Sequence, residues 1–365
     1  HSYWNHPVFP GKDWDGKDYY VNNLSILKDH MLGGLGALSF MRVKGKPFSV
    51  TEYDHPWPNQ YRYEMYPVLA AWAAWQDWDM IYPFSADAEL SNAGNFITGY
   101  FDQLHDPLKV AALPFAARIF RQALVGPAAE EVAFFWDKET ELARLPSARA
   151  WSLFNYDILG APAGLPLYAR VGLSSSPQAH LPAHLNADNS EAGGMDAELQ
   201  GLIARLIVAK PAFPVDTKAG SLVIDMPNLY INVRTGRTAP GPTVFGLQLQ
   251  EALPTHGCLI LLKEGKNSLV LNSFAAGNTG EALGEYRGRL GRKESRLVNP
   301  LNIEKIRSTY MRGRQEAWAF SPRIELEPGF SGRLWAVAGN GALVPAEDSR
   351  ALDPADKTLW WCIKE

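Results

Sequence analysis

The pattern of apolar residues changes along this chain, and the change restricts the folds open to it. In the first 125 residues, short continuously apolar runs alternate with segments of helical spacing. The runs at 46–53 (KPFSVTEY) and 79–85 (DMIYPFS) are typical of strands in a parallel sheet that is covered on both faces. A strand, helix, strand, helix order predicts βαβ units and therefore a parallel sheet.

Helices are predicted between and after these strands. Residues 61–78 and 107–124 carry apolar side chains at helical spacing, and Asp106 followed by Pro107 forms a start signal for the second helix. A further helix is expected over 22–43, although glycines weaken its middle.

Beyond residue 210, short β-rich runs lie between Gly, Asn and Pro turns. Runs such as 220–236 (GSLVIDMPNLYINVRTG) and 257–265 (GCLILLKEG) predict an antiparallel β-sandwich. The region before them is irregular, with one clear strand at 130–136 (EEVAFFW) and a long polar tract. Three regions are thus expected, an α/β region, an irregular linking region with some strand and a β-sandwich domain, at 1–125, 126–210 and 211–365.

Composition excludes several classes of partner. The formal net charge of −4 gives no electrostatic reason to expect nucleic acid or an anionic membrane surface. No apolar run reaches the roughly 18 residues that suggest a membrane span. The chain lacks an initiator Met, so we expect that a targeting segment can precede it. The sequence is compatible with a secreted or periplasmic location and does not fix one.

Metal and cofactor signals are weak. The aspartates of DWDGKD (13–18) resemble the start of a calcium loop, but Leu24 stands where an EF-hand loop needs its Glu. His180 and His184 have zinc-like spacing, yet a proline between them argues against a shared helix face. Two cysteines are too few for a metal site of their own. The sequence predicts no metal and no cofactor.

One acid closes a predicted strand and is followed by an aromatic, proline-rich loop. Glu52 ends the run PFSVTE, and Tyr53, His55 and Trp57 come directly after it. In an α/β barrel the C-terminal ends of the strands form the ligand face. A carboxylate there can act as nucleophile or base, and aromatic rings offer flat faces to sugars. The structural alternative is a capping or salt-bridged Glu, and Glu64 nearby is interpreted as a helix-surface acid.

The segments around Glu52 resemble those of the clan A glycoside hydrolases, which are (β/α)8 barrels. VTEYDHP (50–56) is similar to the seventh barrel strand, which ends in the nucleophilic Glu of that clan. HSYW (1–4) resembles the end of the sixth strand, where a His-x-Tyr pair lies beside the nucleophile. QDWDMIYPF (76–84) resembles the run into the eighth strand, which often carries a sugar-stacking aromatic residue.

The resemblance continues along the chain. FDQLHDPLKVAALPFAARIFRQALVGPA (101–128) is similar to the final barrel helix of proteins like those of glycoside hydrolase family 42. GSLVIDMPNLYINV (220–233) and LVLNSFAAGNTGEAL (269–283) resemble the C-terminal β-domain of such proteins.

The resemblance implies a retaining glycosidase that acts on a β-linked glycan. Glu52 would attack the anomeric carbon, and Tyr3 would hydrogen-bond this carboxylate and orient it. The residues implied to contact the carbohydrate substrate are His1, Tyr3, Trp4, His55, Trp57, Asn59, Tyr82 and Phe84.

The clan also places an acid/base Asn-Glu pair at the end of the fourth barrel strand, and no such strand is found here. A (β/α)8 barrel needs eight strands in about 250 residues, whereas the region before 125 has room for only a few. We therefore expect the C-terminal portion of a (β/α)8 TIM barrel followed by an antiparallel β-sandwich, with the acid/base residue outside this chain.

Two other functions remain open. The first is a non-catalytic carbohydrate-binding protein with a degenerate barrel, in which the β-domain serves attachment. The second assigns the β-domain mainly to contacts between copies in a homo-oligomer. The residue at the end of the fourth barrel strand would separate the first from a glycosidase, because only a Glu there supports catalysis.

Overall fold

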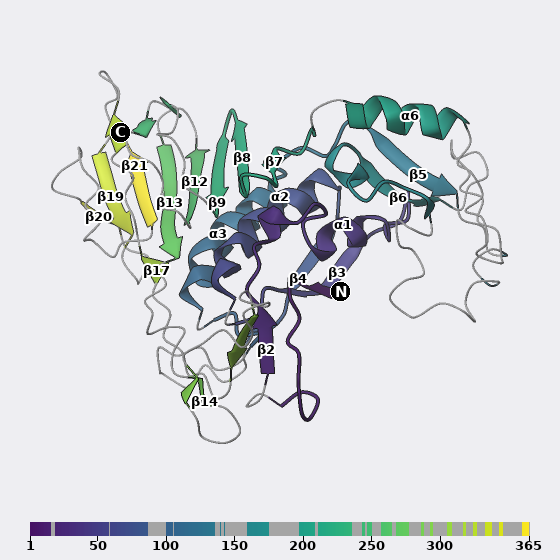
Figure 1. The fold of residues 1–365 in the computed structure, drawn as a ribbon. Coiled ribbons are helices and arrows are strands. Elements are labelled where there is room, and N and C mark those ends of the chain that lie inside the picture. Colours follow the sequence, from purple (N-terminus) through teal and green to yellow (C-terminus); the bar gives the residue numbers. More distant parts are fainter. Residues whose placement is uncertain are drawn as a thin grey trace.

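The structure is a computed structural model (Figure 1). It describes residues 1–15, 19–57, 59–86, 100–104, 106–135, 159–174, 197–208 and 211–235, two isolated positions at 139 and 142, and the strands of the last third of the chain.

The first part of the chain contains three parallel strands: β1 (Ser2–Tyr3), β3 (Ser49–Asp54) and β4 (Met80–Pro83). They pair in the order β1-β3-β4, so each strand lies beside the one that follows it in this set. The predicted strands at 46–53 and 79–85 and their parallel pairing are confirmed. Whether the sheet belongs to an eight-stranded barrel stays a prediction.

Two helices cover one face of this sheet. The short helix η2 (Gln60–Glu64) leads into α2 (Met65–Trp75), and α3 (Pro107–Arg121) follows β4. As predicted, Asp106 caps α3, because its side chain accepts a hydrogen bond from the Leu108 N–H. Ten successive residues of α2, from Met65 onward, are buried, which is the mark of a helix enclosed on all sides.

A large antiparallel sheet packs against α2 and α3 on the side away from the parallel sheet. Its strands run in the order β20-β19-β21-β13-β12-β9-β8-β7, with β17 beside β13. Their bounds are β7 Val215–Asp216, β8 Ser221–Met226, β9 Leu229–Arg234, β12 Gly257–Glu264, β13 Ser268–Ala276, β17 Ala317–Trp318, β19 Arg333–Val337, β20 Leu343–Pro345 and β21 Trp360–Lys364. The predicted short antiparallel strands of this region are therefore confirmed.

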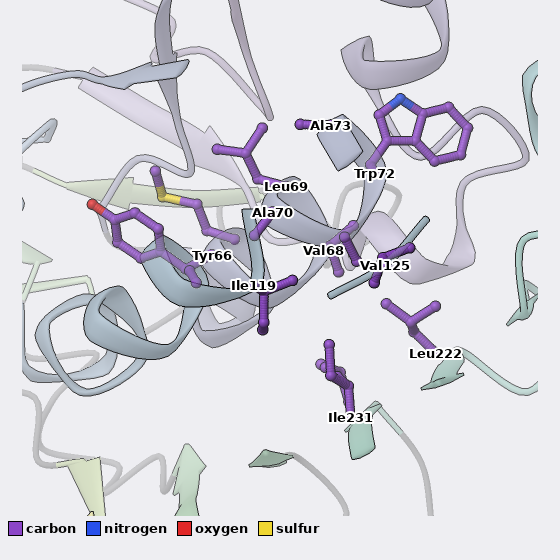
Figure 2. Packing of buried hydrophobic residues seen from close by; sticks show 14 of the residues in the cluster. Tyr66, Val68, Leu69, Ala70, Trp72, Ala73, Ile119, Val125, Leu222 and Ile231 are labelled. Carbon is purple, nitrogen blue, oxygen red and sulfur yellow. The ribbon is translucent and has the colours of Figure 1, made fainter. Parts of the chain in front are cut away.

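The helices and the antiparallel sheet share one hydrophobic core. Leu222 of β8 and Ile231 of β9 face Val68 of α2 and Val125, which follows α3 (Figure 2). All four are buried completely or almost so. The apolar core thus runs across the boundary that was predicted between the α/β and β regions, and the two-sheet sandwich stays a prediction.

Smaller pairings complete the described strands. β2 (Tyr19–Asn22) pairs with β16 (Lys305–Ser308), which joins the first and last thirds of the chain. The remaining pairs are formed by β10 Thr243–Val244, β11 Leu247–Leu249 and β18 Ile324–Leu326, and by β14 Tyr286–Arg287 and β15 Lys293–Glu294.

The linking region contains more regular structure than predicted. β5 (Glu131–Phe135) lies where a strand was expected, and it pairs in parallel with β6 (Arg170–Ser174). The short helix η3 (Leu165–Leu167) and the helix α6 (Ala197–Val208) were not predicted. Their apolar residues form a second core with the two strands, so this part of the chain is a small layered unit beside the first sheet (Figure 1).

The helix expected over 22–43 is wrong in extent. The structure has only η1 (Ile26–Lys28) and α1 (Gly34–Ser39) there. Gly33 has a φ of 61°, and a Cβ on it would lie 2.5 Å from the ring of Trp4; a Cβ on Gly34 would lie 1.9 Å from the hydroxyl of Ser2. The predicted helix is therefore broken at Gly33, and Gly34 opens α1 where only a residue without a Cβ fits beside Ser2.

Glu64 is not the surface acid that the sequence suggested. Its side chain is fully buried where η2 meets α2, and it accepts hydrogen bonds from the Ser25 hydroxyl at 2.8 Å and from the Ile26 N–H at 2.9 Å. Burial raises the pKa of Glu64 to about 8, although these hydrogen bonds act in the opposite direction. One carboxyl group thus ties η1 to the start of α2.

Glu64 should make the stability of the protein depend on pH. Its pKa rises from 4.5 to about 8 on folding, so between these values the folded protein keeps a proton that the unfolded chain releases. The free energy of unfolding should therefore fall as pH rises through this window, by at most about 1.4 kcal/mol per pH unit. Urea unfolding of wild type and Glu64→Gln at pH 5, 6, 7 and 8 measures this. Other buried groups titrate in both proteins, so the difference between them isolates Glu64, and parallel stability curves would contradict the assignment.

Candidate functional site

Glu52 lies on β3 at an irregularity in the pairing with β4. Val50 pairs with Ile81 and Tyr53 pairs with Pro83, so three steps along β3 match two along β4. The extra residue is a β-bulge, which can redirect a side chain. In an unbroken strand Glu52 would share the face of the buried Val50, whereas here it is half-buried and reaches the side chain of Tyr3.

Tyr3 and Glu52 form a direct hydrogen bond. The Tyr3 hydroxyl donates to Oε2 of Glu52 at 2.5 Å. Tyr3 pairs with Asp54 in the parallel register, so the Tyr3 and Glu52 side chains come from the C-terminal ends of neighbouring strands. Burial raises the pKa of Tyr3, and the hydrogen bond to Glu52 and its charge raise it further. The phenol therefore stays protonated at neutral pH and remains a donor to the carboxylate.

Several aromatic rings contact the ring of Tyr3. Phe101 stacks on the Tyr3 ring with a centroid separation of 4.4 Å and an interplanar angle of 22°. Phe84, just beyond β4, meets Tyr3 edge-on at 6.2 Å, and the ring of His1 lies 6.2 Å from it on a tilted plane. Four of the predicted site residues are thus connected in space: Glu52, Tyr3, His1 and Phe84.

Tyr82 and Trp4 have different surroundings. Tyr82 lies on β4 and is 52% exposed, with its hydroxyl 3.4 Å from the Met80 sulfur. Trp4 follows β1, and its indole N–H donates to the Leu24 carbonyl at 2.8 Å. Its ring packs against the main core. Of these two predicted contacts, Tyr82 has a surface that a ligand can reach, and Trp4 serves the packing of β1.

The predicted contacts on the loop after β3 are buried. His55 and Asn59 have no exposed surface, and Trp57 is 2% exposed. Nε2 of His55 lies 3.1 Å from the Tyr53 hydroxyl, and Asn59 donates to the carbonyls of Asn22 and Leu24. In this conformation these residues fix the loop. Their direct contact with substrate stays a prediction.

A buried ion pair holds the end of β3. Nζ of Lys109, on α3, lies 2.6 Å from Oδ1 of Asp54, and both side chains are at most 1% exposed. The same oxygen accepts the His55 N–H at 2.7 Å. Burial raises the pKa of Asp54 to about 6, and Lys109 opposes that rise. Sequence reasoning missed this pair, although a lysine among the apolar residues of a helix was a usable signal, because buried lysines need partners.

Lys109 also anchors the segment that carries Phe101. Its Nζ donates to the Asp102 carbonyl at 3.1 Å, and the Gln103 side chain donates to the Phe84 carbonyl at 3.0 Å. The Ser85 N–H donates to the Phe101 carbonyl at 2.9 Å. Phe84 and Phe101 therefore take their places beside Tyr3 from one network that starts at the ion pair.

A second buried ion pair lies at the start of α3. Nε of Arg62 donates to the Asp106 carboxylate, and both side chains are fully buried. The Arg62 guanidinium also lies 4.5 Å from the centre of the Trp57 ring. The first turn of α3 thus holds both β3 and the loop that follows it.

The part of the chain that the structure describes contains no group of three or more His, Cys, Asp or Glu side chains that could hold a metal ion. Among the described helices, none has both the length and the apolar character needed to cross a membrane. His180 and His184 lie outside the described residues.

Comparisons with known protein families, with curated proteins and with solved structures found no match for this chain.

Removing one partner of the Asp54–Lys109 pair should cost far more than removing both charges together. Lys109→Met leaves a buried carboxylate without its counter-ion, which should lower the free energy of unfolding by about 3–5 kcal/mol. Adding Asp54→Asn should recover part of that loss. Urea unfolding of the wild type, the two single variants and the double variant at pH 7.5 gives the coupling energy. Strictly additive losses would show that the two charges do not depend on each other.

Proposed function

We propose that this protein is a retaining glycoside hydrolase that acts on a β-linked glycan, with Glu52 as the nucleophile. The observation that carries the proposal is the hydrogen bond from the Tyr3 hydroxyl to the Glu52 carboxylate at the ends of two neighbouring parallel strands. Ligand sites of parallel α/β sheets lie at these ends.

The surroundings of Glu52 suit attack on a sugar. A hydrogen bond to the charged form of a carboxylate favours that form and fixes one oxygen, which leaves the other oxygen for the anomeric carbon. In the proposed step a bond forms between that oxygen and the anomeric carbon, and the bond from this carbon to the leaving oxygen breaks. Phe84, 37% exposed, offers an apolar face beside the reacting ring.

A retaining mechanism needs a second carboxyl group about 5–5.5 Å from the first. Asp54 is the nearest acid along β3, but its carboxylate is buried and paired with Lys109, so it is not suited to protonate a leaving group. The proposal assigns that role to a carboxyl group contributed by the remainder of the barrel. This chain alone is then expected to be nearly inactive on natural glycosides.

A substrate with an activated leaving group tests the nucleophile without requiring the acid. Dinitrophenolate leaves without being protonated, so 2,4-dinitrophenyl 2-deoxy-2-fluoro-β-glycosides should glycosylate Glu52 even in this chain. The reagents are used in the gluco, galacto, manno and xylo configurations. Mass spectrometry of peptides should find one fluoroglycosyl group on Glu52 for at least one configuration.

Two variants make this test specific. Glu52→Gln should take up no label, whereas Glu130→Gln, which removes an exposed carboxylate away from the site, should be labelled like the wild type. Labelling of Glu52→Gln at the wild-type rate, or no label on Glu52 from any of the four reagents, would overturn the nucleophile assignment. Sugar binding without labelling would favour the non-catalytic carbohydrate-binding alternative.

A further inference from the structure

A second group of aromatic side chains extends from Tyr3 toward solvent. The ring of His6 lies 5.4 Å from Tyr3 and 5.5 Å from Trp14, and Phe9 lies 5.5 Å from Trp14. We call His6, Phe9 and Trp14 the aromatic shelf. Through His6 the shelf is continuous with the Tyr3–Glu52 pair, and none of its members was a predicted site residue.

The shelf exposes a large apolar side chain to water, and the backbone of that residue is in an unfavourable conformation. Trp14 is 62% exposed, the largest exposed fraction of any tryptophan among the described residues. It also has a φ of 62°, a backbone conformation that bulky residues rarely adopt. An exposed tryptophan held in an unfavourable backbone conformation beside a candidate site points to a ligand rather than to packing.

Further rings pack against the shelf. Phe9 contacts Tyr19 at 6.3 Å and Tyr100 at 5.7 Å, and Tyr19 is only 3% exposed. His6 contacts Phe101, the residue that stacks on Tyr3, at 5.9 Å. The same side chains therefore hold the shelf and the Tyr3 ring in place. Binding of a ligand then costs little conformational entropy, because the surface is already ordered.

Polar groups beside the shelf define the kind of ligand. Nδ1 of His6 lies 2.7 Å from the Pro7 carbonyl, which can only accept, so Nδ1 is the donor of this hydrogen bond. Lys12 and Asp13, next to Trp14, are exposed. Flat aromatic faces combined with scattered donors and acceptors suit a sugar, which has C–H faces and hydroxyl groups. Asp13 and Asp15 beside Trp14 disfavour a polyanion.

We propose that Trp14, His6 and Phe9 form a stacking surface for a further sugar unit of a β-linked glycan whose reactive unit lies at Glu52. This inference rests on the proposed function and adds to it a preference for oligosaccharides over single sugars. The occupant is a carbohydrate because the shelf is continuous with the Glu52 site and shares its mixture of rings and polar groups.

The dependence of affinity on glycan length tests the proposal. The full chain is titrated by calorimetry with mono-, di- and tetrasaccharides of β-1,4-linked glucose, galactose, mannose and xylose. At least one tetrasaccharide should bind about tenfold or more tightly than its monosaccharide, since the shelf adds a contact of its own. Trp14→Ala should remove most of that gain, and Trp14→Phe, which keeps a ring, should retain most of it.

Controls separate the shelf from folding and from the nucleophile. Val208→Ala truncates an 87% exposed apolar residue on α6 and should leave the length dependence unchanged. Circular dichroism and thermal unfolding show whether each variant is folded. If Trp14→Ala does not fold, the comparison uses Trp14→Phe. The proposal is overturned if no series shows a gain with length, or if both Trp14 variants keep the full gain. Labelling of Glu52 uses single-sugar reagents, so a length effect without labelling refutes only the nucleophile, and labelling without a length effect refutes only the shelf.

Discussion

The buried pair of Asp54 and Lys109 is the interaction on which the candidate site depends. It joins the last residue of β3 to the first turn of α3, and Lys109 also holds the backbone at Asp102. Two charges removed from water need close contact and further hydrogen bonds to be tolerated, and the site supplies both. The network that begins there places Phe101 and Phe84 in contact with each other and with Tyr3, and Tyr3 in turn orients Glu52.

The helices give this arrangement a rigid support. α2 and α3 lie between the small parallel sheet and the large antiparallel sheet, and both sheets contribute to one continuous core (Figures 1 and 2). A helix enclosed in this way needs apolar residues on every side, which explains the run MYPVLAAWAAW of α2. The antiparallel sheet therefore supports the site, because it packs against α2 and against α3, which carries Lys109.

Local patterns predicted the parts of the fold that local physics decides. The apolar runs of β3 and β4, the spacing in α2 and the Asp106–Pro107 start of α3 all lie close to their predicted places. The pairing of β2 with β16 joins segments that are far apart in the sequence, so the local spacing of residues does not predict it. The bulge before Tyr53 depends on the register with β4, which local spacing does not predict either. Tyr3 and Glu52 were predicted to meet through family resemblance, whereas the burial of His55 and Trp57 depends on tertiary contacts.

The configuration of a rescued product tests the central claim most directly. In Glu52→Ala, azide can occupy the space that the carboxylate leaves and attack the anomeric carbon of a 2,4-dinitrophenyl β-glycoside, while the bond to the phenolate oxygen breaks and dinitrophenolate departs with its electron pair. NMR of the product should show an α-glycosyl azide, because attack comes from the side of Glu52. A β-glycosyl azide, or no azide product from any of the gluco, galacto, manno and xylo substrates, would contradict the assignment of Glu52 as nucleophile.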